Sequence, residues 1–336
     1  MKDIFDKTDH FKEREHILSH LLYGNPDDCP NPLVSVIMPV YNRPDTFPAS
    51  LASVLNQQCN FPFEIVVVDN KAEGDRTESQ DIVEATGAKN IMYYRNEENI
   101  GMYDNWNRGI LLSRGKYITY CHDDDMLLPD ALQRLVHVSQ IIGEDKAIFT
   151  KYNMIDENGN LINKYAFPHR RLGFLEESEY QKFSLYDQFI GSYSFGNGCL
   201  FKRENLLEIG GFDRDYYPAT DAAAFAKYTY YYGSVVINNP TFNYRIAQNA
   251  SRNIGTILSI NEQTYKIRKE IMNVLSLPNF VLRPYAEAMH RLTPHILMNN
   301  YEIEDKSVLP TLHKCDRVIK RVFAHFSRNK GYKIKF

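Results

Sequence analysis

The sequence lacks the features that mark disulfide-rich, zinc-binding or membrane-spanning proteins. Its 336 residues include only five cysteines, which are widely spaced and form no CxxC pair. That pattern argues against a disulfide framework or a zinc site and fits a reducing compartment. No apolar run approaches the ~20 residues that a membrane-spanning helix needs. The charged N-terminal stretch MKDIFDKTDHFKEREH has no apolar core, so we expect no secretion signal.

An excess of charge of one sign is also absent. The formal net charge is −3, which gives no reason to expect nucleic acid as a partner of the chain. The apolar content of 43% and the charged content of 24% are ordinary for a globular protein. We therefore expect a globular, cytoplasmic protein with one large domain or two modest ones.

Short β-branched runs alternate with helix-like segments in the first half of the chain. Strands are predicted at LVSVIMPVYN, FEIVVVDN, NIMYYRN and KYITYC. The alternation predicts βαβ units and an α/β fold with a mainly parallel sheet flanked by helices. Residues 1–31 are predicted as an amphipathic helix over residues 3–23, followed by a linker. Residues 253–336 are predicted as a C-terminal helical extension, with breaks near Pro278 and Pro310.

The middle of the chain is less regular. KAIFTKYNMID is predicted as a strand, and GCLFKRE as a strand that enters a helix. A further helix is expected to begin near Thr220, whose hydroxyl can cap it. The segment SVVINNPTFNYRIA is predicted as a hairpin that turns at Asn-Asn-Pro.

Polar residues follow the predicted strands at the points where the strands end. Asn42 follows the first strand, Asp69 and Asn70 end the second, and Asp123–Asp125 follow the fourth. Because ligands bind at the carboxyl ends of strands in open α/β sheets, we expect these residues to line one site.

Three consecutive aspartates, Asp123, Asp124 and Asp125, suggest a metal ion. Like charges repel, and a carboxylate beside a buried strand costs free energy unless it is neutralised. Mg²⁺ and Mn²⁺ prefer oxygen ligands, so either cation would suit the triplet. The alternative is a solvated acidic turn in which Asp125 or Asp130 caps the next helix, but capping does not require three aspartates.

The ordered motifs PLVSVIMPVYNRPDTFPASLASVLNQ, FEIVVVDN and NIGMYDNWNRGILLSRGKYITYCHDDDMLLPDAL resemble inverting family-2 glycosyltransferases. The resemblance resumes at GNGCLFKRENLLEIGGFD and at the Thr-Asp pair that follows. It implies a glycosyltransferase A fold over residues 32–252, with a nucleotide-binding half at 32–130 and an acceptor-binding half at 131–252. It also implies a divalent metal, Mn²⁺ or Mg²⁺, and a nucleoside diphosphate sugar donor, most often a UDP-sugar.

Carried over by position, the resemblance implies roles for single residues. Those implied to bind the nucleotide sugar are Pro39, Tyr41, Asn42, Asp69, Asn99, Gly101, Asp123, Arg245 and Arg252. The implied metal ligands are Asp124 and Asp125, and the implied acceptor-binding residues are Asn197, Gly210 and Gly211.

Several of these residues have a simpler alternative role. An Asx turn that closes a strand is an equal alternative for Asp69. Gly101 has the alternative of allowing a turn without contacting a ligand. Arg245 and Arg252 fit surface ion pairs. Trp106 fits a helix core better than a sugar platform.

The chain departs from the family pattern at two places. His122 stands where many members have the first aspartate of an Asp-any-Asp motif. We expect it to bind a phosphate or to support the metal ligands, although imidazole can also bind Mn²⁺. The second strand ends in Asp69-Asn70 where a pair of aspartates is common, which leaves the identity of the base open.

The resemblance places a general base at the start of the helix after the GGFD turn. The matching pair is Thr220-Asp221, which implies Asp221 as the base. The alternative is that Asp221 only stabilises the N-terminal end of the helix. Asp213 and Asp215 are the next candidates.

The C-terminal stretch is basic. Between His313 and Phe336 there are eight Lys or Arg residues against one acid, Asp316, with apolar residues among them. A basic amphipathic helix can lie on an anionic membrane surface, and the alternative is a solvated packing helix.

Taken with the resemblance, these patterns predict a metal-dependent inverting glycosyltransferase of the hexosyltransferase type. Its acceptor would be a glycan or a lipid-linked molecule in bacterial-type surface polysaccharide synthesis, at the inner face of the plasma membrane. One alternative is a catalytically silent nucleotide-sugar-binding subunit that partners another transferase. A sugar nucleotidyltransferase would need a glycine-rich, lysine-containing loop where PVYNRPDTF stands.

Overall fold

The alternating segments of the first half build one six-stranded sheet. The computed structural model describes residues 3–166, 180–191, 196–246, 253–300, 303, 307–326 and 331–332. In the first sheet β4, β3, β2 and β5 run parallel, and β1 and β10 add to the two edges in antiparallel orientation. Its strands are β1 (Ser19–Tyr23), β4 (Ile91–Asn96), β3 (Phe63–Asp69), β2 (Val34–Val40), β5 (Tyr117–Tyr120) and β10 (Phe201–Lys202). The predicted mainly parallel sheet is confirmed.

The first sheet is buried on both faces, which explains the continuous apolar runs of its strands. The covering helices are α1 (Phe47–Leu55), α2 (Glu78–Thr86) and α3 (Met102–Leu112). Met38 packs in the core cluster that includes Phe47 of α1, whereas its neighbour Ile37 packs in a second cluster with Trp106 of α3. Trp106 is therefore core, as expected.

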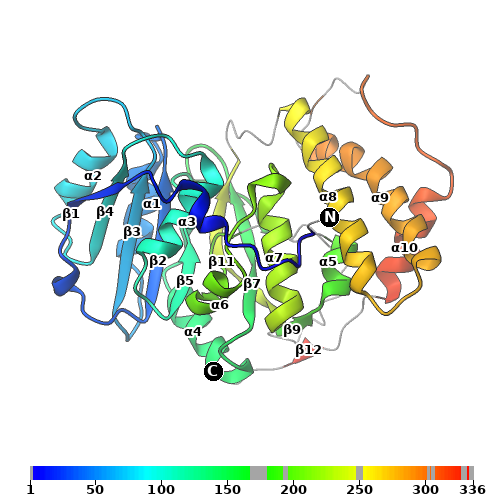
Figure 1. Cartoon of the computed structure of the whole chain (residues 1–336), viewed down its shortest axis with the longest axis horizontal. Helices are drawn as coiled ribbons and strands as arrows, with labels where there is room; N and C mark the ends of the chain where they lie inside the picture. Colours follow the sequence, from blue (N-terminus) through cyan, green and yellow to red (C-terminus); the bar gives the residue numbers. More distant parts are fainter. Residues whose placement is uncertain are drawn as a thin grey trace.

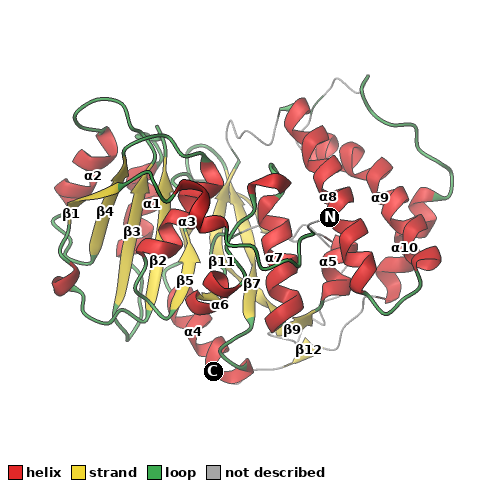
Figure 2. Cartoon of the chain, in the orientation of Figure 1, coloured by secondary structure: helices red, strands yellow, loops and turns green. Residues whose placement is uncertain are grey.

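A second, mixed sheet stands beside the first (Figure 2). Its order is β12-β9-β11-β7-β8, with β6 also paired to β11, and only β7 and β11 run parallel. Its strands are β6 (Met126–Leu127), β7 (Ala147–Ile155), β8 (Leu161–Ala166), β9 (Tyr180–Phe183), β11 (Ser234–Arg245) and β12 (Gly331–Tyr332).

The hairpin predicted at SVVINNPTFNYRIA is wrong, because Ser234–Arg245 of this segment form the single long strand β11. The register against β7 shifts between Ile237 and Pro240 and again between Pro240 and Phe242. A register irregularity accommodates a proline, which has no N–H to donate, so the strand continues past it.

The remaining helices lie around the second sheet and at the end of the molecule away from β1 (Figure 1). They are α4 (Ala131–Ile142), α5 (Leu185–Gly191), α6 (Arg203–Glu208), α7 (Thr220–Tyr232), α8 (Ile254–Val274), α9 (Asn279–Asn300) and α10 (Asp316–Phe326). The predicted helical extension is confirmed in α8, α9 and α10. The sequence analysis did not predict β12, which pairs with β9 of the second sheet.

The amphipathic helix predicted over residues 3–23 is wrong. This segment contains the short 3₁₀ turn η1 (His10–Arg14) and then the edge strand β1, and the linker contains η2 (Pro26–Asp28). In Figure 1 it crosses from the helical end of the molecule to the far edge of the first sheet. Leu21 and Leu22 are exposed, so pairing with β4 has overridden a helical spacing of apolar residues.

Gly210 and Gly211 lie beneath this N-terminal segment, and acceptor binding by them stays a prediction. Both have left-handed backbone, with φ of +85° and +74°. The carbonyl of Gly210 accepts the N–H of His10 at 3.1 Å. A Cβ atom on Gly210 would stand 1.8 Å from the backbone oxygen of Thr8. The two glycines therefore allow the N-terminal segment to approach the backbone closely.

We predict that Gly210→Ala destabilises the protein more than Gly87→Ala does. Gly87 also has left-handed backbone, with φ of +61°, but a Cβ atom there would meet no other described part of the chain within 4 Å. The control should lose about 1–2 kcal/mol from backbone strain alone. Gly210→Ala should lose clearly more, because the N-terminal segment must also move. Urea unfolding measures both losses, and equal losses would contradict the close contact.

Candidate active site

The loops after three parallel strands meet at one edge of the first sheet. Tyr41 and Asn42 are exposed after β2, Pro39 lies just before them, and Asn70 follows β3. The N–H of Asn70 donates to the carbonyl of Val40 at 2.9 Å. The prediction that the residues at these strand ends lie close together is therefore confirmed.

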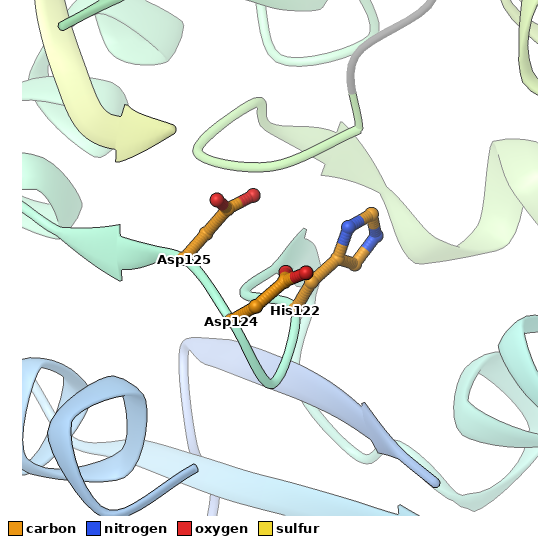
Figure 3. Close-up of side chains that lie close together, drawn as sticks. All are labelled: His122, Asp124 and Asp125. Carbon is orange, nitrogen blue, oxygen red and sulfur yellow. The ribbon is translucent and has the colours of Figure 1, made fainter. Parts of the chain in front are cut away.

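The turn between β5 and β6, residues 121–125, carries the acidic triplet and is called the aspartate turn below. Asp123 accepts the N–H of Tyr41 at 3.1 Å, which ties the turn to the end of β2. One potential ligand atom from each of His122, Asp124 and Asp125 lies within 4.8 Å of the other two (Figure 3). We call these three residues the ligand cluster.

Helix capping does not account for the acidic triplet. Asp130 occupies the N-cap position of α4 without a side-chain hydrogen bond to the helix. Asp125 is buried and instead accepts the N–H of Arg245 at 2.8 Å and an amide N–H of Asn197. The capping alternative is therefore not supported by the geometry.

Negative charge is poorly compensated in the aspartate turn. Burial, together with the charge of Asp124, raises the pKa of Asp123 to about 7 and that of Asp125 well above its ordinary value. In the described part of the chain, Asp124 has one ion-pair partner, Arg43, at 3.9 Å. A divalent cation would relieve both the repulsion and the desolvation.

His122 presents a neutral imidazole to the same place. Burial of the ring lowers its pKa to about 4, which exceeds the opposing effect of Asp124. The ring lies against Trp106, with centroids 4.8 Å apart. Its Nε2 atom is buried and has no hydrogen-bond partner among the described residues.

The ligand cluster fits a hard divalent cation. Carboxylate oxygens are the ligands that Mg²⁺ and Mn²⁺ prefer, and imidazole is acceptable to first-row transition metals. The predicted ligands Asp124 and Asp125 both belong to the cluster, and metal binding by them stays a prediction. His122, expected beside the ligands rather than among them, is close enough to be one.

Asp69 lies beneath the edge, where it closes its own turn. One of its oxygens accepts the hydroxyls of Tyr93 and Thr77 at 2.6 and 2.8 Å, and the other accepts the N–H of Lys71 at 2.9 Å. The last contact is an Asx turn, the alternative left open by the sequence. Contact with a base stays a prediction.

Asn70 organises the loop that begins α3. Its side-chain oxygen accepts the N–H of Ile100 at 3.0 Å, and its amide donates to Asn99 Oδ1 at 2.8 Å. Asn99 Oδ1 also accepts the N–H of Gly101, which has a φ of +86°. An aspartate at position 70 has no amide to donate, so the departure from the family pattern has a local reason. Ligand contact by Asn99 and Gly101 stays a prediction.

Arg245 holds the aspartate turn from behind. Its Nε donates to the carbonyl of Asp124 at 2.8 Å, and its Nη1 donates to the carbonyls of Asp156 and Glu157 at 3.1 and 2.7 Å. This buried arrangement fits a positioning role rather than a surface ion pair, and phosphate contact by Arg245 stays a prediction. Arg252 lies outside the described residues.

Asn197 supports the ligand cluster, and the sequence did not predict this role. Its side-chain oxygen accepts the backbone N–H of His122 at 3.0 Å, while its amide donates to Asp125. Asn197 therefore lies beneath the cluster, and acceptor binding by it stays a prediction. Its contacts are separated by more than seventy residues in the chain, so no local pattern could reveal them.

Asp221 lies in the first turn of α7. Burial of its carboxyl group raises its pKa to about 7, and it accepts the N–H of Ala222 at 2.8 Å. The charge of Asp221 contributes to the raised pKa of Tyr103, after burial, so the two side chains are near one another. Thr220 is helical and does not cap α7, because Ala219 occupies the N-cap position.

The two other candidate bases are less suitable. Asp213 caps η3 (Arg214–Tyr216) by accepting the N–H of Asp215 at 2.9 Å, and it faces Nε2 of His10 at 3.3 Å. Asp215 is exposed. Asp221 is buried in the first turn of α7, and burial raises the pKa of its carboxyl group to about 7, which suits a general base.

Sequence comparison identifies relatives of this arrangement. A family model described as glycosyl transferase family 2 matches residues 35–210, just over half of the chain. An uncharacterized glycosyltransferase of Methanocaldococcus jannaschii is 30% identical over 154 residues, 44% of this chain and 52% of that protein. An uncharacterized protein of Mycobacterium tuberculosis is 30% identical over 199 residues, 56% and 60% of the two chains. The chain spans little more than half the length of these relatives.

Solved structures share the fold. TarS 1–349 of S. aureus in complex with UDP-GlcNAc superposes with a TM-score of 0.54 and 15% identity over 88% of each chain. The mannosyltransferase PcManGT of Pyrobaculum calidifontis, in complex with GDP-Man and Mn²⁺, gives 0.53 and 18% over 90% of this chain and 88% of that chain. At these identities the likeness confirms the predicted fold and leaves ligands to be argued separately.

We predict that Asp124→Asn abolishes stabilisation by Mn²⁺ without destabilising the metal-free protein. Removing this charge relieves repulsion on Asp123 and Asp125, so the melting temperature in chelator should stay equal or rise. The unchanged protein should gain ~2.7 kcal/mol of apparent stability at a hundred times the dissociation constant.

Asp130→Asn is the matched control, since Asp130 is exposed and pairs with Arg134 at 2.9 Å, outside the ligand cluster. It should keep the full Mn²⁺-dependent rise in a thermal-shift titration. A normal rise in Asp124→Asn would remove Asp124 from the metal site.

Proposed function

The chain belongs to glycosyl transferase family 2, and on that premise we propose that it is a metal-dependent, inverting transferase of the hexosyltransferase type. It moves a sugar from a nucleoside diphosphate donor to a hydroxyl group of a glycan or lipid-linked acceptor in surface polysaccharide synthesis. The observation that carries the proposal is the ligand cluster, which lies at the strand ends where this class of fold binds ligands.

The donor site is proposed at the edge formed by Tyr41, Asn42 and Asn99. Related folds have been solved with UDP-GlcNAc and with GDP-Man, which supports a nucleotide-sugar donor and makes a UDP-sugar the first choice. A divalent cation held by Asp124 and Asp125 would offset the charge that develops on the departing diphosphate.

Asp221 is proposed as the general base. A carboxyl group with a pKa of about 7 is divided between its acid and base forms near neutral pH, as a base for a hydroxyl group requires. Its ionised form takes the proton of the acceptor hydroxyl while the oxygen bonds to the anomeric carbon. The bond from that carbon to the diphosphate breaks on the opposite face, and the configuration inverts.

Tyr217 is proposed as part of the acceptor surface. Its side chain is 60% exposed, and it lies four residues before Asp221. Its ring meets the ring of Tyr103 edge to face, with centroids 6.0 Å apart. Because Tyr103 is also near Asp221, an exposed aromatic ring in contact with Tyr103 would support an apolar sugar face close to the base.

The second candidate, a silent nucleotide-sugar-binding subunit, is less well supported. Such a subunit has no need of a base, and so gives no reason for a carboxyl group whose pKa burial raises to about 7. Slow hydrolysis of the donor that depends on Mn²⁺ or Mg²⁺ and on Asp221 would exclude it. Donor binding without turnover under any metal condition would favour it.

We propose that helix α10 of the basic C-terminal stretch takes both roles that the sequence left open, packing and membrane contact. Phe323 of α10 packs against Tyr285 with ring centroids 4.9 Å apart. On the outer side, Val318 and Val322 are 57% and 47% exposed, next to the exposed Arg317 and Arg321. None of the helices in the described ranges combines the length and apolar character needed to cross a bilayer. We infer that this outer face contacts an anionic membrane surface at the cytoplasmic side.

We predict that Asp221→Asn lowers turnover by ~10²–10⁴ while donor affinity changes little. In the unchanged protein the rate should rise tenfold per pH unit below pH 7 and level off above it, because the base must be ionised. The residual rate of Asp221→Asn should lack that rise. Turnover at saturating substrates from pH 5 to 9 measures both effects.

Asp215→Asn is the control for the same change of charge near the start of α7. It should keep normal turnover and the same pH profile. Unimpaired turnover in Asp221→Asn, with a lowered melting temperature, would assign Asp221 to helix stabilisation, which is worth ~0.3–1 kcal/mol.

We predict that Arg317→Glu with Arg321→Glu weakens binding to anionic vesicles by on the order of tenfold or more, since each basic residue near such a surface contributes ~1 kcal/mol. Vesicle co-sedimentation measures the effect, with neutral vesicles for comparison. Lys12→Glu with Lys89→Glu changes the net charge equally in the first half of the chain and should bind as before. Equal losses in both double variants would make the attraction nonspecific.

A further inference from the structure

We propose that the connection between α8 and α9 is an apolar anchor that enters the headgroup region of an anionic membrane. The connection is residues 273–281, called the tip below. The inference rests on the proposed function only for the kind of partner, an anionic membrane surface, and it assigns a contact separate from the outer face of α10. The observations that carry it are the exposed apolar side chains of the tip, its lack of charge, and the positive charge around it.

The tip exposes a contiguous group of apolar side chains. Phe280 is 79% exposed, the highest exposed fraction among the large apolar residues of the described chain. Val274, Leu277 and Val281 are exposed beside it in the sequence. A single exposed apolar residue is ordinary in a globular protein, whereas a contiguous group marks an interaction site.

The first turn of α9 directs the ring of Phe280 outward. The N–H groups of Val281 and Leu282 donate to the carbonyl of Pro278 at 2.9 and 3.3 Å, which closes the turn. Leu282 is fully buried in the core cluster of the helical end. Residues two apart on a helix lie on nearly opposite sides. The burial of Leu282 therefore fixes Phe280 on the side that faces solvent.

No charged residue lies within the tip, and the exposed charges that flank it are positive. The first exposed charged residues before and after it in the chain are Lys269 and Arg283. Glu270 lies between Lys269 and the tip, but it is half-buried, and its carboxylate accepts the hydroxyl of Tyr216 at 2.7 Å. Arg283 has a loose ion pair with Glu287, with nitrogen and oxygen 3.5 Å apart.

Helix α10 brings further positive charge to the same end of the helical extension. The rings of Tyr285 in α9 and Phe323 in α10 are 4.9 Å apart, and Arg291 in α9 pairs with Asp316 in α10 at 2.7 Å. The two helices are therefore antiparallel, and the C-terminal half of α10, with Arg321, lies toward the start of α9. Apolar side chains bordered by cations fit a bilayer whose headgroups are anionic.

A second copy of the chain is a less suitable occupant. A two-fold contact through the tip would bring Lys269, Arg283 and Arg321 of the two copies near one another, and like charges across an interface oppose association. The projecting ring of Phe280 would also need a matching pocket in a protein partner. A fluid bilayer adapts to a projecting ring without such a pocket.

The test is binding of the full chain to vesicles of phosphatidylglycerol and phosphatidylcholine in equal parts. Phe280→Ser should weaken binding by on the order of tenfold, because an aromatic side chain then no longer leaves water. The loss should persist in high salt, which screens the contribution of the arginines and leaves the apolar contribution unchanged.

Leu18→Ser is the matched control. Leu18 is 54% exposed and directly precedes β1, at the end of the molecule away from the helical extension (Figure 1). This variant loses an exposed apolar side chain in the same way and should bind vesicles as the unchanged protein does.

Fluorescence of Phe280→Trp gives the second readout. The chain has one tryptophan, Trp106, whose side chain is buried in the core. With vesicles, the emission of Phe280→Trp should move to shorter wavelength and be quenched by lipids brominated in the acyl chains. The unchanged protein should show neither effect. A melting curve confirms that each variant is folded, and Phe280→Trp decides if Phe280→Ser is not.

The outcomes separate this anchor from the proposed function. Normal vesicle binding by Phe280→Ser, or emission of Phe280→Trp that vesicles leave unchanged, would overturn the anchor. An emission shift that follows protein concentration without vesicles would assign the tip to a second copy instead. Metal-dependent donor hydrolysis is measured without vesicles, so its absence beside a normal response of the tip would overturn the transferase and leave the anchor.

Discussion

The burial of several carboxylates in one short turn is the constraint on which the rest of the site depends. The aspartate turn is held by donors from three distant segments: the N–H of Tyr41 after β2, the amide of Asn197, and the N–H of Arg245 in β11. β2 belongs to the first sheet and β11 to the second. The aspartate turn therefore connects the two sheets. The contacts that connect them are the same contacts that stabilise the mutually repelling carboxylates of the turn.

The same contacts explain why the turn favours a cation from outside the chain. The guanidinium of Arg245 donates to the carbonyls of Asp124, Asp156 and Glu157, and Arg43 reaches Asp124 only at 3.9 Å. The buried Arg245 thus fixes the backbone of the turn, and its charge offsets only part of the rise in the pKa of Asp125. Charge left uncompensated at a strand edge is what a divalent ion with a diphosphate would neutralise.

The sequence predicted the parts whose cause is local. β2 and β3 lie in a parallel sheet covered on both faces, and such strands leave continuous Val and Ile runs. The sequence-based prediction failed where contacts with distant segments determine the structure. Residues 19–23 form an edge strand because they pair with β4. Likewise, β11 continues through Asn-Asn-Pro because it pairs with neighbouring strands on both sides. The acidic triplet was visible as a pattern, whereas the support of Asn197 depends on contacts that only folding creates.

Burial acts on two groups of carboxylates in this site with different consequences. Burial and the charge of Asp124 raise the pKa values of Asp123 and Asp125. A bound cation would therefore stabilise the ionised form of both carboxylates. Burial raises the pKa of Asp221 to about 7, and no neighbouring carboxylate contributes to this rise. Asp221 can therefore bind and release a proton near neutral pH. A cation in the ligand cluster would ionise the first group and leave the second poised near neutrality. In the proposed mechanism, burial would thereby supply both a place for negative charge to be neutralised and a place for a proton to be taken up.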